Sequence, residues 1–121
     1  MTDLQLAVMR AVWDVGPATL AELHADLSRE RELAPTTVGT LLSRLRKQQL
    51  VSATRRGRQL VYSANVSEWE VRGTLLRRLM ARLFGGDSVA LVQHLLASDS
   101  IGKEDVQRIR ALIGEAGGRR K

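Results

Sequence analysis

The order of helical and strand patterns along the chain is what most constrains its fold. Apolar residues recur every three or four positions over about residues 3–15, 19–31 and 35–48, which predicts three helices. Two β-rich runs follow at residues 50–54 and 59–63, and the Arg-Arg-Gly-Arg turn between them predicts a hairpin. Three helices followed by a hairpin are typical of a winged helix-turn-helix domain.

Residue types mark where the helices begin. A Thr or Ser followed three residues later by Glu or Gln predicts a capping box at Thr2–Gln5, Thr19–Glu22 and Ser67–Glu70. Proline suits the first turn of a helix, because its missing N–H would have no partner there, so Pro35 is expected to start the third helix. After the hairpin, three more helices are expected at about residues 67–84, 87–97 and 103–115. The fold class is therefore mainly α with a small β-hairpin.

The chain is expected to divide near Asn65–Val66. Residues 1–66 are predicted to form a winged helix-turn-helix DNA-binding domain, and residues 67–116 a helical dimerisation region. Residues 117–121 are predicted to be a disordered basic tail.

Composition excludes several functional classes. The 121 residues contain no Cys, which excludes disulfides and cysteine-ligated zinc, and the two His lie far apart in the sequence, so neither metal nor cofactor is expected. No nucleophile elbow, phosphate loop or paired-carboxylate site is present, so an enzyme is not expected. The first residues, Met1-Thr2-Asp3, lack the basic start and apolar run of a signal peptide, and no apolar run is long enough to cross a membrane, so a cytoplasmic protein is expected. A net charge of +6 favours a polyanionic partner.

The expected third helix has two distinct faces. Val38, Leu41, Leu42 and Leu45 form a stripe that should be buried. The opposite face and the helix start supply the candidate DNA contacts: Pro35, Thr36, Thr37, Thr40, Ser43, Arg44 and Lys47. Short hydroxyls near the helix start can reach base edges, and cations one to two turns later can neutralise phosphates. An ordinary solvated polar face would look the same, although a mid-helix Gly39 suggests close approach to another surface.

The hairpin strengthens the DNA interpretation. Between Ser43 and Arg58 the chain carries six Arg or Lys and no Asp or Glu. Arg56, Gly57 and Arg58 at the tip are the expected wing contacts with a phosphate or the minor groove. A solvated basic turn is the alternative, but together with the third helix the pattern favours DNA.

The C-terminal helices carry many apolar residues for their size. Three short helices make a thin core, and a second copy of the chain would cover it. The residues expected at such a dimer interface are Leu75, Leu79, Leu83, Leu91, Val92, Leu95, Ile109, Leu112 and Ile113. The alternative is that these helices fold back on the winged helix of the same chain.

The segment from Leu33 to Leu45 closely resembles the recognition helix of the BlaI/MecI/CopY family of penicillinase-type repressors. That family shows the pattern Leu-Ala-Tyr-Thr-Thr-Val-x-Thr-Leu-Leu-x-Arg-Leu, and here Pro35 replaces the aromatic residue. Similarity continues through Val61–Tyr62 and the Leu83–Ser88 turn, over nearly the whole chain.

The resemblance implies a homodimeric repressor on inverted-repeat operator DNA, often of the TACA/TGTA type. It also implies dimerisation by the C-terminal helices. In some members a membrane sensor with a metallopeptidase domain triggers cleavage at an Asn-Phe bond, and the matching pair here is His94–Leu95. Copper-responsive members carry Cys-x-Cys pairs, which this chain lacks.

The expected function is therefore a DNA-binding transcriptional repressor released by an inducing signal. One alternative is a winged-helix interaction module that docks an acidic partner protein. Another is an architectural DNA binder with little preference for sequence.

Overall fold

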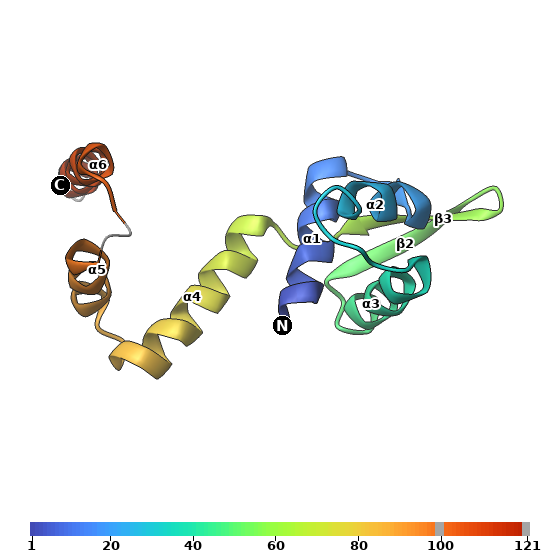
Figure 1. Cartoon of the computed structure of the whole chain (residues 1–121), viewed down its shortest axis with the longest axis horizontal. Coiled ribbons are helices and arrows are strands. Elements are labelled where there is room, and N and C mark those ends of the chain that lie inside the picture. The colour runs from blue at the N-terminus through green and yellow to red at the C-terminus, as the bar shows by residue number, and fades with distance from the viewer. Residues whose placement is uncertain (99–100, 120–121) are drawn as a thin grey trace. The chain divides into compact units, whose positions relative to one another are not determined.

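The computed structural model describes residues 1–98 and 101–119, which form two compact units, Met1–Gly73 and Thr74–Lys121. The elements in chain order (Figure 1) are α1 (Asp3–Val15), β1 (Ala18–Thr19), α2 (Leu20–Leu27), α3 (Pro35–Lys47), β2 (Val51–Arg56), β3 (Gln59–Ala64), α4 (Glu68–Phe84), α5 (Ser88–Ala97) and α6 (Lys103–Arg119). The mainly helical winged-helix class is confirmed. α2 ends at Leu27, earlier than its apolar pattern suggested, because the next residues form a turn.

Capping boxes fix the starts of α1 and α2, as predicted. The Thr2 hydroxyl oxygen accepts from the Gln5 backbone N–H at 3.1 Å, and the Gln5 side-chain oxygen accepts from the Thr2 N–H at 3.0 Å. Thr19 and Glu22 repeat the arrangement at α2. A cap of this kind stabilises a helix by about 1 kcal/mol.

The hairpin is one part of a three-stranded antiparallel sheet in the order β1-β3-β2. The strand β1 was not predicted, because a two-residue strand carries no periodic signal. Its partners lie far along the chain, with Ala18 opposite Tyr62 and Thr19 opposite Val61. β2 and β3 join through a tight turn at Gly57, whose φ of +64° is a conformation that glycine adopts without strain.

One hydrophobic core holds the N-terminal unit together. α1, α2 and α3 pack around Met9, Leu23, Leu42 and Leu45, all of them fully buried. Ala18 and Tyr62 close the core from the sheet side. The chain has few aromatic residues, and the buried core is accordingly made of Val, Leu, Met and Ala side chains with one Tyr.

The boundary between the two units falls inside α4 rather than before it. The indole N–H of Trp13 donates to the carbonyl oxygen of Val66 at 2.9 Å. Val71, in the first turns of α4, is 8% exposed. The start of α4 therefore belongs with the N-terminal unit, which sequence periodicity alone could not reveal.

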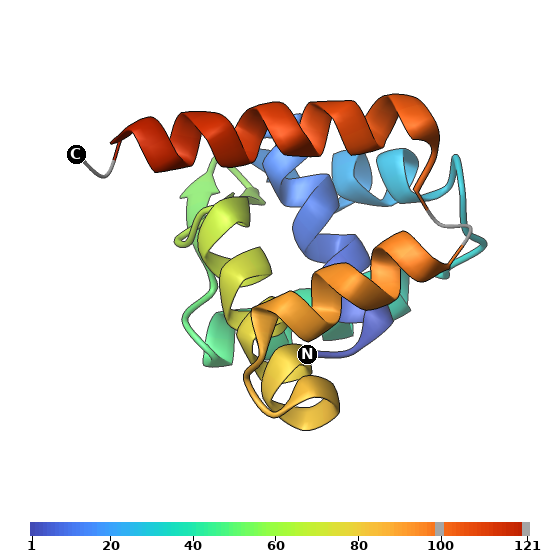
Figure 2. The ribbon, with the colours of Figure 1, turned by 90° about the vertical axis from the view of Figure 1, so that its left-hand side faces the viewer.

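The C-terminal unit has no buried side chain among residues 74–98 and 101–116. Asp87 caps α5, accepting from the backbone N–H groups of Val89 and Ala90. α6 continues to Arg119, into the segment predicted as a tail, and Figure 2 shows it as one uninterrupted helix. Glycine weakens a helix by only about 1 kcal/mol and proline is absent here, so Gly117 and Gly118 do not end it. Residues 120–121 of the predicted tail lie outside the described residues.

Candidate nucleic-acid interface

α3 has the two faces that its sequence predicts. Val38, Leu41, Leu42 and Leu45 are buried. The exposed residues are Pro35, Thr36, Thr40, Ser43, Arg44, Arg46 and Lys47, and Thr37 is half-buried. The structure thus presents six of the seven predicted contacts on α3 at the surface. It adds Arg46, which the predicted contact set omits.

The first turn of α3 is open at its N-terminus. Ala34 precedes Pro35 and makes no side-chain hydrogen bond to the first turn. Pro35 has no N–H, and the Thr37 and Val38 N–H groups donate to the Ala34 carbonyl oxygen at 3.0 and 3.2 Å, so the Thr36 N–H and the positive end of the helix dipole are what this turn offers a phosphate oxygen. One turn on, the Thr40 hydroxyl donates to the carbonyl oxygen of Thr36 at 3.0 Å.

Gly39 has a structural explanation. A Cβ added there would lie 3.2 Å from the Leu20 Cδ1 atom of α2. The close approach that a mid-helix glycine suggested is therefore an approach of α2 to α3, and no outside surface is needed to explain it.

The wing carries exposed cations. Arg55, Arg56 and Arg58 are all exposed, and Arg56 pairs with Gln59 at the end of the ladder. Figure 1 shows the β2–β3 hairpin reaching beyond the helices that pack on the sheet. The three predicted wing residues, Arg56, Gly57 and Arg58, thus lie at its exposed tip.

A shallow depression on α3 adds a basic feature. It has a volume of about 320 Å³ and is lined by Ser43, Arg46 and Lys47. Two cations beside a hydroxyl form a surface suited to a phosphate oxygen.

One acidic group, the carboxylate of Glu22, lies within range of the Arg56 charge on the wing. The backbone N–H and the hydroxyl of Thr19 hydrogen-bond the Glu22 carboxylate and lower its pKa, and the charge of Arg56 lowers the pKa further. The Glu22 side chain therefore stays ionised at neutral pH.

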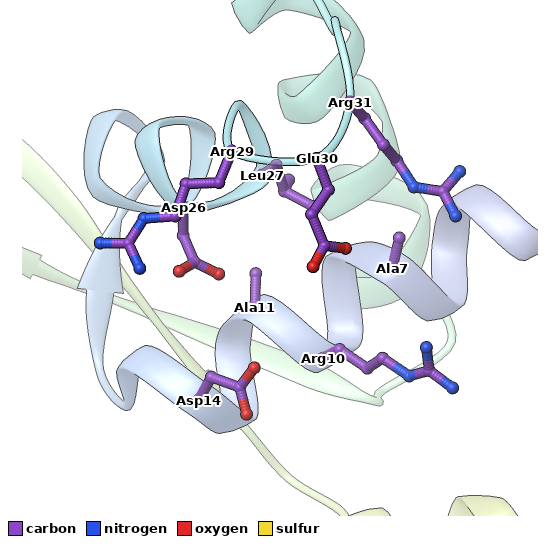
Figure 3. Close-up of a pocket in the computed structure, with 9 residues that line it drawn as sticks. All are labelled: Ala7, Arg10, Ala11, Asp14, Asp26, Leu27, Arg29, Glu30 and Arg31. Atoms are coloured by element: carbon purple, nitrogen blue, oxygen red, sulfur yellow. The ribbon is translucent and has the colours of Figure 1, made fainter.

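A second groove lies between α1 and the end of α2, with a volume of about 330 Å³. In Figure 3 the carboxylates of Asp14, Asp26 and Glu30 point toward the groove, and the guanidinium groups extend to its edges. Both signs of charge line this groove, in contrast to the purely basic surface of α3 and the wing tip. The full lining is Ala7, Arg10, Ala11, Asp14, Asp26, Leu27, Arg29, Glu30 and Arg31.

Neither histidine belongs to a metal-binding group. Within residues 1–98 and 101–119, no cluster of three His, Cys, Asp or Glu side chains is placed to hold a metal ion. His24 Nε2 lies 2.6 Å from the Leu33 carbonyl oxygen, and the His94 ring lies edge-on to Phe84 at 6.0 Å. None of the described helices is both long and apolar enough to span a membrane.

The predicted dimerisation residues lie at the surface of the C-terminal unit. Leu75, Leu91 and Ile109 are half-buried. The other six are exposed: Leu79, Leu83, Val92, Leu95, Leu112 and Ile113. Several apolar side chains here are more than 60% exposed, including Val89, which the predicted set omits. The apolar surface is thus larger than the sequence suggested.

Known proteins resemble the chain along its length. The family model described as Penicillinase repressor matches residues 1–115. A penicillinase repressor of Bacillus licheniformis is 25% identical over 121 residues, covering 100% of this chain and 94% of the relative. The transcriptional regulator BlaI of Mycobacterium tuberculosis is 32% identical over 115 residues, covering 93% of this chain and 82% of the relative.

A solved structure also matches. The solution structure of monomeric Bacillus licheniformis BlaI in complex with the blaP half-operator is 31% identical and superposes with a TM-score of 0.50. The superposition covers 56% of this chain and 83% of that one. The match to the family model extends well beyond this share and includes residues of both compact units.

Proposed function

Because the chain belongs to the penicillinase repressor family, we propose that it binds an inverted-repeat operator as a homodimer, with α3 and the β2–β3 wing of each copy on the DNA. The family is one of DNA-binding transcriptional repressors and not of enzymes, which confirms the predicted repressor class and the prediction that the chain is not an enzyme. The observation that carries the proposal is that the cations of α3 and of the wing tip are all exposed, with no Asp or Glu between Ser43 and Arg58.

α3 enters the major groove by its N-terminal end in this proposal. The uncapped first turn meets a phosphate, and the exposed Thr36, Thr40 and Ser43 lie where short side chains reach base edges. Arg44 and Lys47, one to two turns later, neutralise the backbone or reach a guanine.

The wing contacts the flank of the same site. Arg56 and Arg58 reach a phosphate or the adjacent minor groove, and Gly57 lets the strands turn tightly between them. Phosphate contacts position the protein, whereas base contacts on α3 give the preference for sequence.

Pairing of two chains covers the apolar C-terminal surface. No side chain of residues 74–98 and 101–116 is buried within one copy, so a second copy supplies the missing partner. A two-fold dimer then matches the two half-sites of an inverted repeat.

An inducing signal ends repression by weakening this pairing. In some members of the BlaI/MecI/CopY family, a membrane sensor with a metallopeptidase domain triggers cleavage of the repressor. Here His94 and Leu95, at the matching position, are both exposed on α5. Cleavage there would separate α6 from the rest of the interface.

Fluorescence anisotropy tests the proposal, with a TACA/TGTA inverted-repeat duplex and a scrambled duplex at low and at physiological salt. We expect selective binding, two chains per duplex, and affinity that falls as salt rises. Equal binding to both duplexes would instead support the architectural role, and binding to neither would support a protein-interaction module.

A double variant tests the residue assignment. Arg44→Ala with Arg56→Ala should weaken operator binding and lower the slope of log K against log salt by about 1.8 if each Arg holds one phosphate. Arg29→Ala with Arg31→Ala removes the same charge from the groove of Figure 3 and should change binding much less. Unchanged affinity in the first variant would contradict the assignment.

A further inference from the structure

The carboxylate of Glu22 is an exposed negative charge at the start of α2, directly after the strand β1 of the sheet that carries the wing. It belongs to the first turn of α2 and is held there by Thr19, with Glu22 Oε1 accepting from the Thr19 N–H and hydroxyl, both at 3.1 Å. The capping box therefore fixes a negative charge at one place on the surface, although the side chain is exposed.

The sheet register places this charge beside the wing. Thr19 of β1 and Thr54 of β2 both pair with Val61 of β3, so the three residues form one row across the sheet. β1 and β2 are each antiparallel to β3 and so run in the same direction. Arg56 lies two residues beyond Thr54, about 7 Å along the strand and on the same face as Thr54.

A second contact places the start of α2 beside α3. The Leu20 side chain lies against Gly39, close enough that an added Cβ would be 3.2 Å from it. The first turn of α2 therefore lies against α3, and it follows directly on β1, which flanks β3 in the sheet. The effect of the Arg56 charge on Glu22 agrees with this placement.

We propose that Glu22 is a built-in counter-charge near Arg56 that lowers the affinity of this face for DNA of any sequence. The inference rests on the proposed DNA-binding function and adds to it a residue that limits affinity. Repulsion between a carboxylate and nearby phosphates weakens every DNA complex alike, whereas base contacts on α3 are made only on the operator. Glu22 thus lowers the affinity for all DNA together, and α3 sets the preference between sequences.

Glu22→Gln tests this with little structural change. Glutamine can replace glutamate in the box, as Gln5 shows at Thr2, so α2 keeps its cap and loses only the charge. We expect the scrambled and the operator duplex each to bind about two- to fivefold more tightly at low salt, the gain to shrink at higher salt, and the ratio of operator to scrambled affinity to stay unchanged.

Glu30→Gln is the matched control. It changes the net charge equally, but its side chain lines the α1–α2 groove of Figure 3. Its effect on the scrambled duplex should be less than half that of Glu22→Gln. Equal effects would overturn the inference, because net charge alone would then explain them.

The role of Arg56 needs a double-mutant cycle. In an Arg56→Gln background, Glu22→Gln should give a clearly smaller gain, and persistence of the full gain would overturn the part of the inference that concerns Arg56. If the wild-type chain binds neither duplex, the proposed function itself fails. If it binds the operator selectively and Glu22→Gln matches it within error, only this inference fails.

Discussion

Trp13 and Val66 are joined by a hydrogen bond of 2.9 Å from the indole N–H to the backbone carbonyl oxygen. The bond links the last turns of α1 to the three-residue connection between β3 and the first turn of α4. It therefore holds the base of α4 on the N-terminal unit, although the two residues are far apart in sequence.

Trp13→Phe should remove this bond while keeping an aromatic ring. We expect a loss of about 1–3 kcal/mol in the free energy of unfolding, because the half-buried Val66 carbonyl would lose its partner. Urea unfolding followed by circular dichroism measures this. Trp69→Phe is the control: Trp69 is 80% exposed and its replacement should cost less than about 0.5 kcal/mol. Equal losses in the two variants would contradict the prediction.

Gly39→Ala sets helix propensity against packing. Alanine favours a helix by about 1 kcal/mol over glycine, but the new Cβ would press on the Leu20 Cδ1 atom at 3.2 Å. We expect a small net destabilisation in the wild-type background and a stabilisation of up to about 1 kcal/mol in a Leu20→Ala background. Chemical denaturation of the four proteins gives the cycle. The same sign in both backgrounds would show that Leu20 does not limit this site.

Glu22 should also make the free energy of unfolding depend on pH in the acid range. Its folded pKa is lowered by the Thr19 hydrogen bonds, so its contribution is present above the ordinary carboxyl pKa of about 4.5 and is lost as pH falls through the folded value. Between about pH 5 and pH 3 the wild-type midpoint should therefore fall more steeply than that of Glu22→Gln. Thermal melts across this range test it, with Glu30→Gln expected to follow the wild type more closely.

Arg46→Gln should reveal a contact that the sequence-based set omits. If Arg46 binds a phosphate in the depression with Ser43 and Lys47, the slope of log K against log salt falls by about 0.9. Operator and scrambled duplexes should weaken by similar factors, because a phosphate carries no sequence information. Arg29→Gln is the charge-matched control. An unchanged slope for Arg46→Gln would exclude this contact.

Ile113→Asp should disrupt the proposed dimer. Ile113 is 63% exposed in one chain, so a charge there costs little in the monomer but would be unpaired in an apolar interface. Sedimentation should show more monomer, and operator affinity should fall while half-site binding remains. Gln107→Glu changes charge by the same amount on the same helix and should leave pairing intact. A fully dimeric Ile113→Asp protein would place the interface elsewhere.

Local chemistry explains which parts of the fold could be predicted. Capping residues and the buried stripe of α3 act over three to seven positions, so the sequence shows them directly. β1 could not be predicted, because its two residues form a strand only through pairing with Tyr62 and Val61. The packing that favours a glycine at position 39 could not be predicted either, since Leu20 contacts this position only once α2 and α3 pack together.

The candidate site follows the same rule. A helical wheel identified the exposed hydroxyls and cations of α3, but Arg46 lies at the edge of that face and its shared depression exists only in three dimensions. The effect of the Arg56 charge on Glu22 depends on the strand order β1-β3-β2, which cannot be predicted from any single segment of the sequence.

The hydroxyl of Thr40 is already used inside the helix. Its proton is donated to the Thr36 carbonyl oxygen, which leaves the hydroxyl oxygen as an acceptor. In the proposed DNA complex this oxygen can receive an amino hydrogen of adenine or cytosine while the bond to Thr36 stays in place, whereas donation to guanine or thymine requires the hydroxyl to rotate away from Thr36. A backbone carbonyl of α3 thus favours adenine and cytosine over guanine and thymine at this threonine.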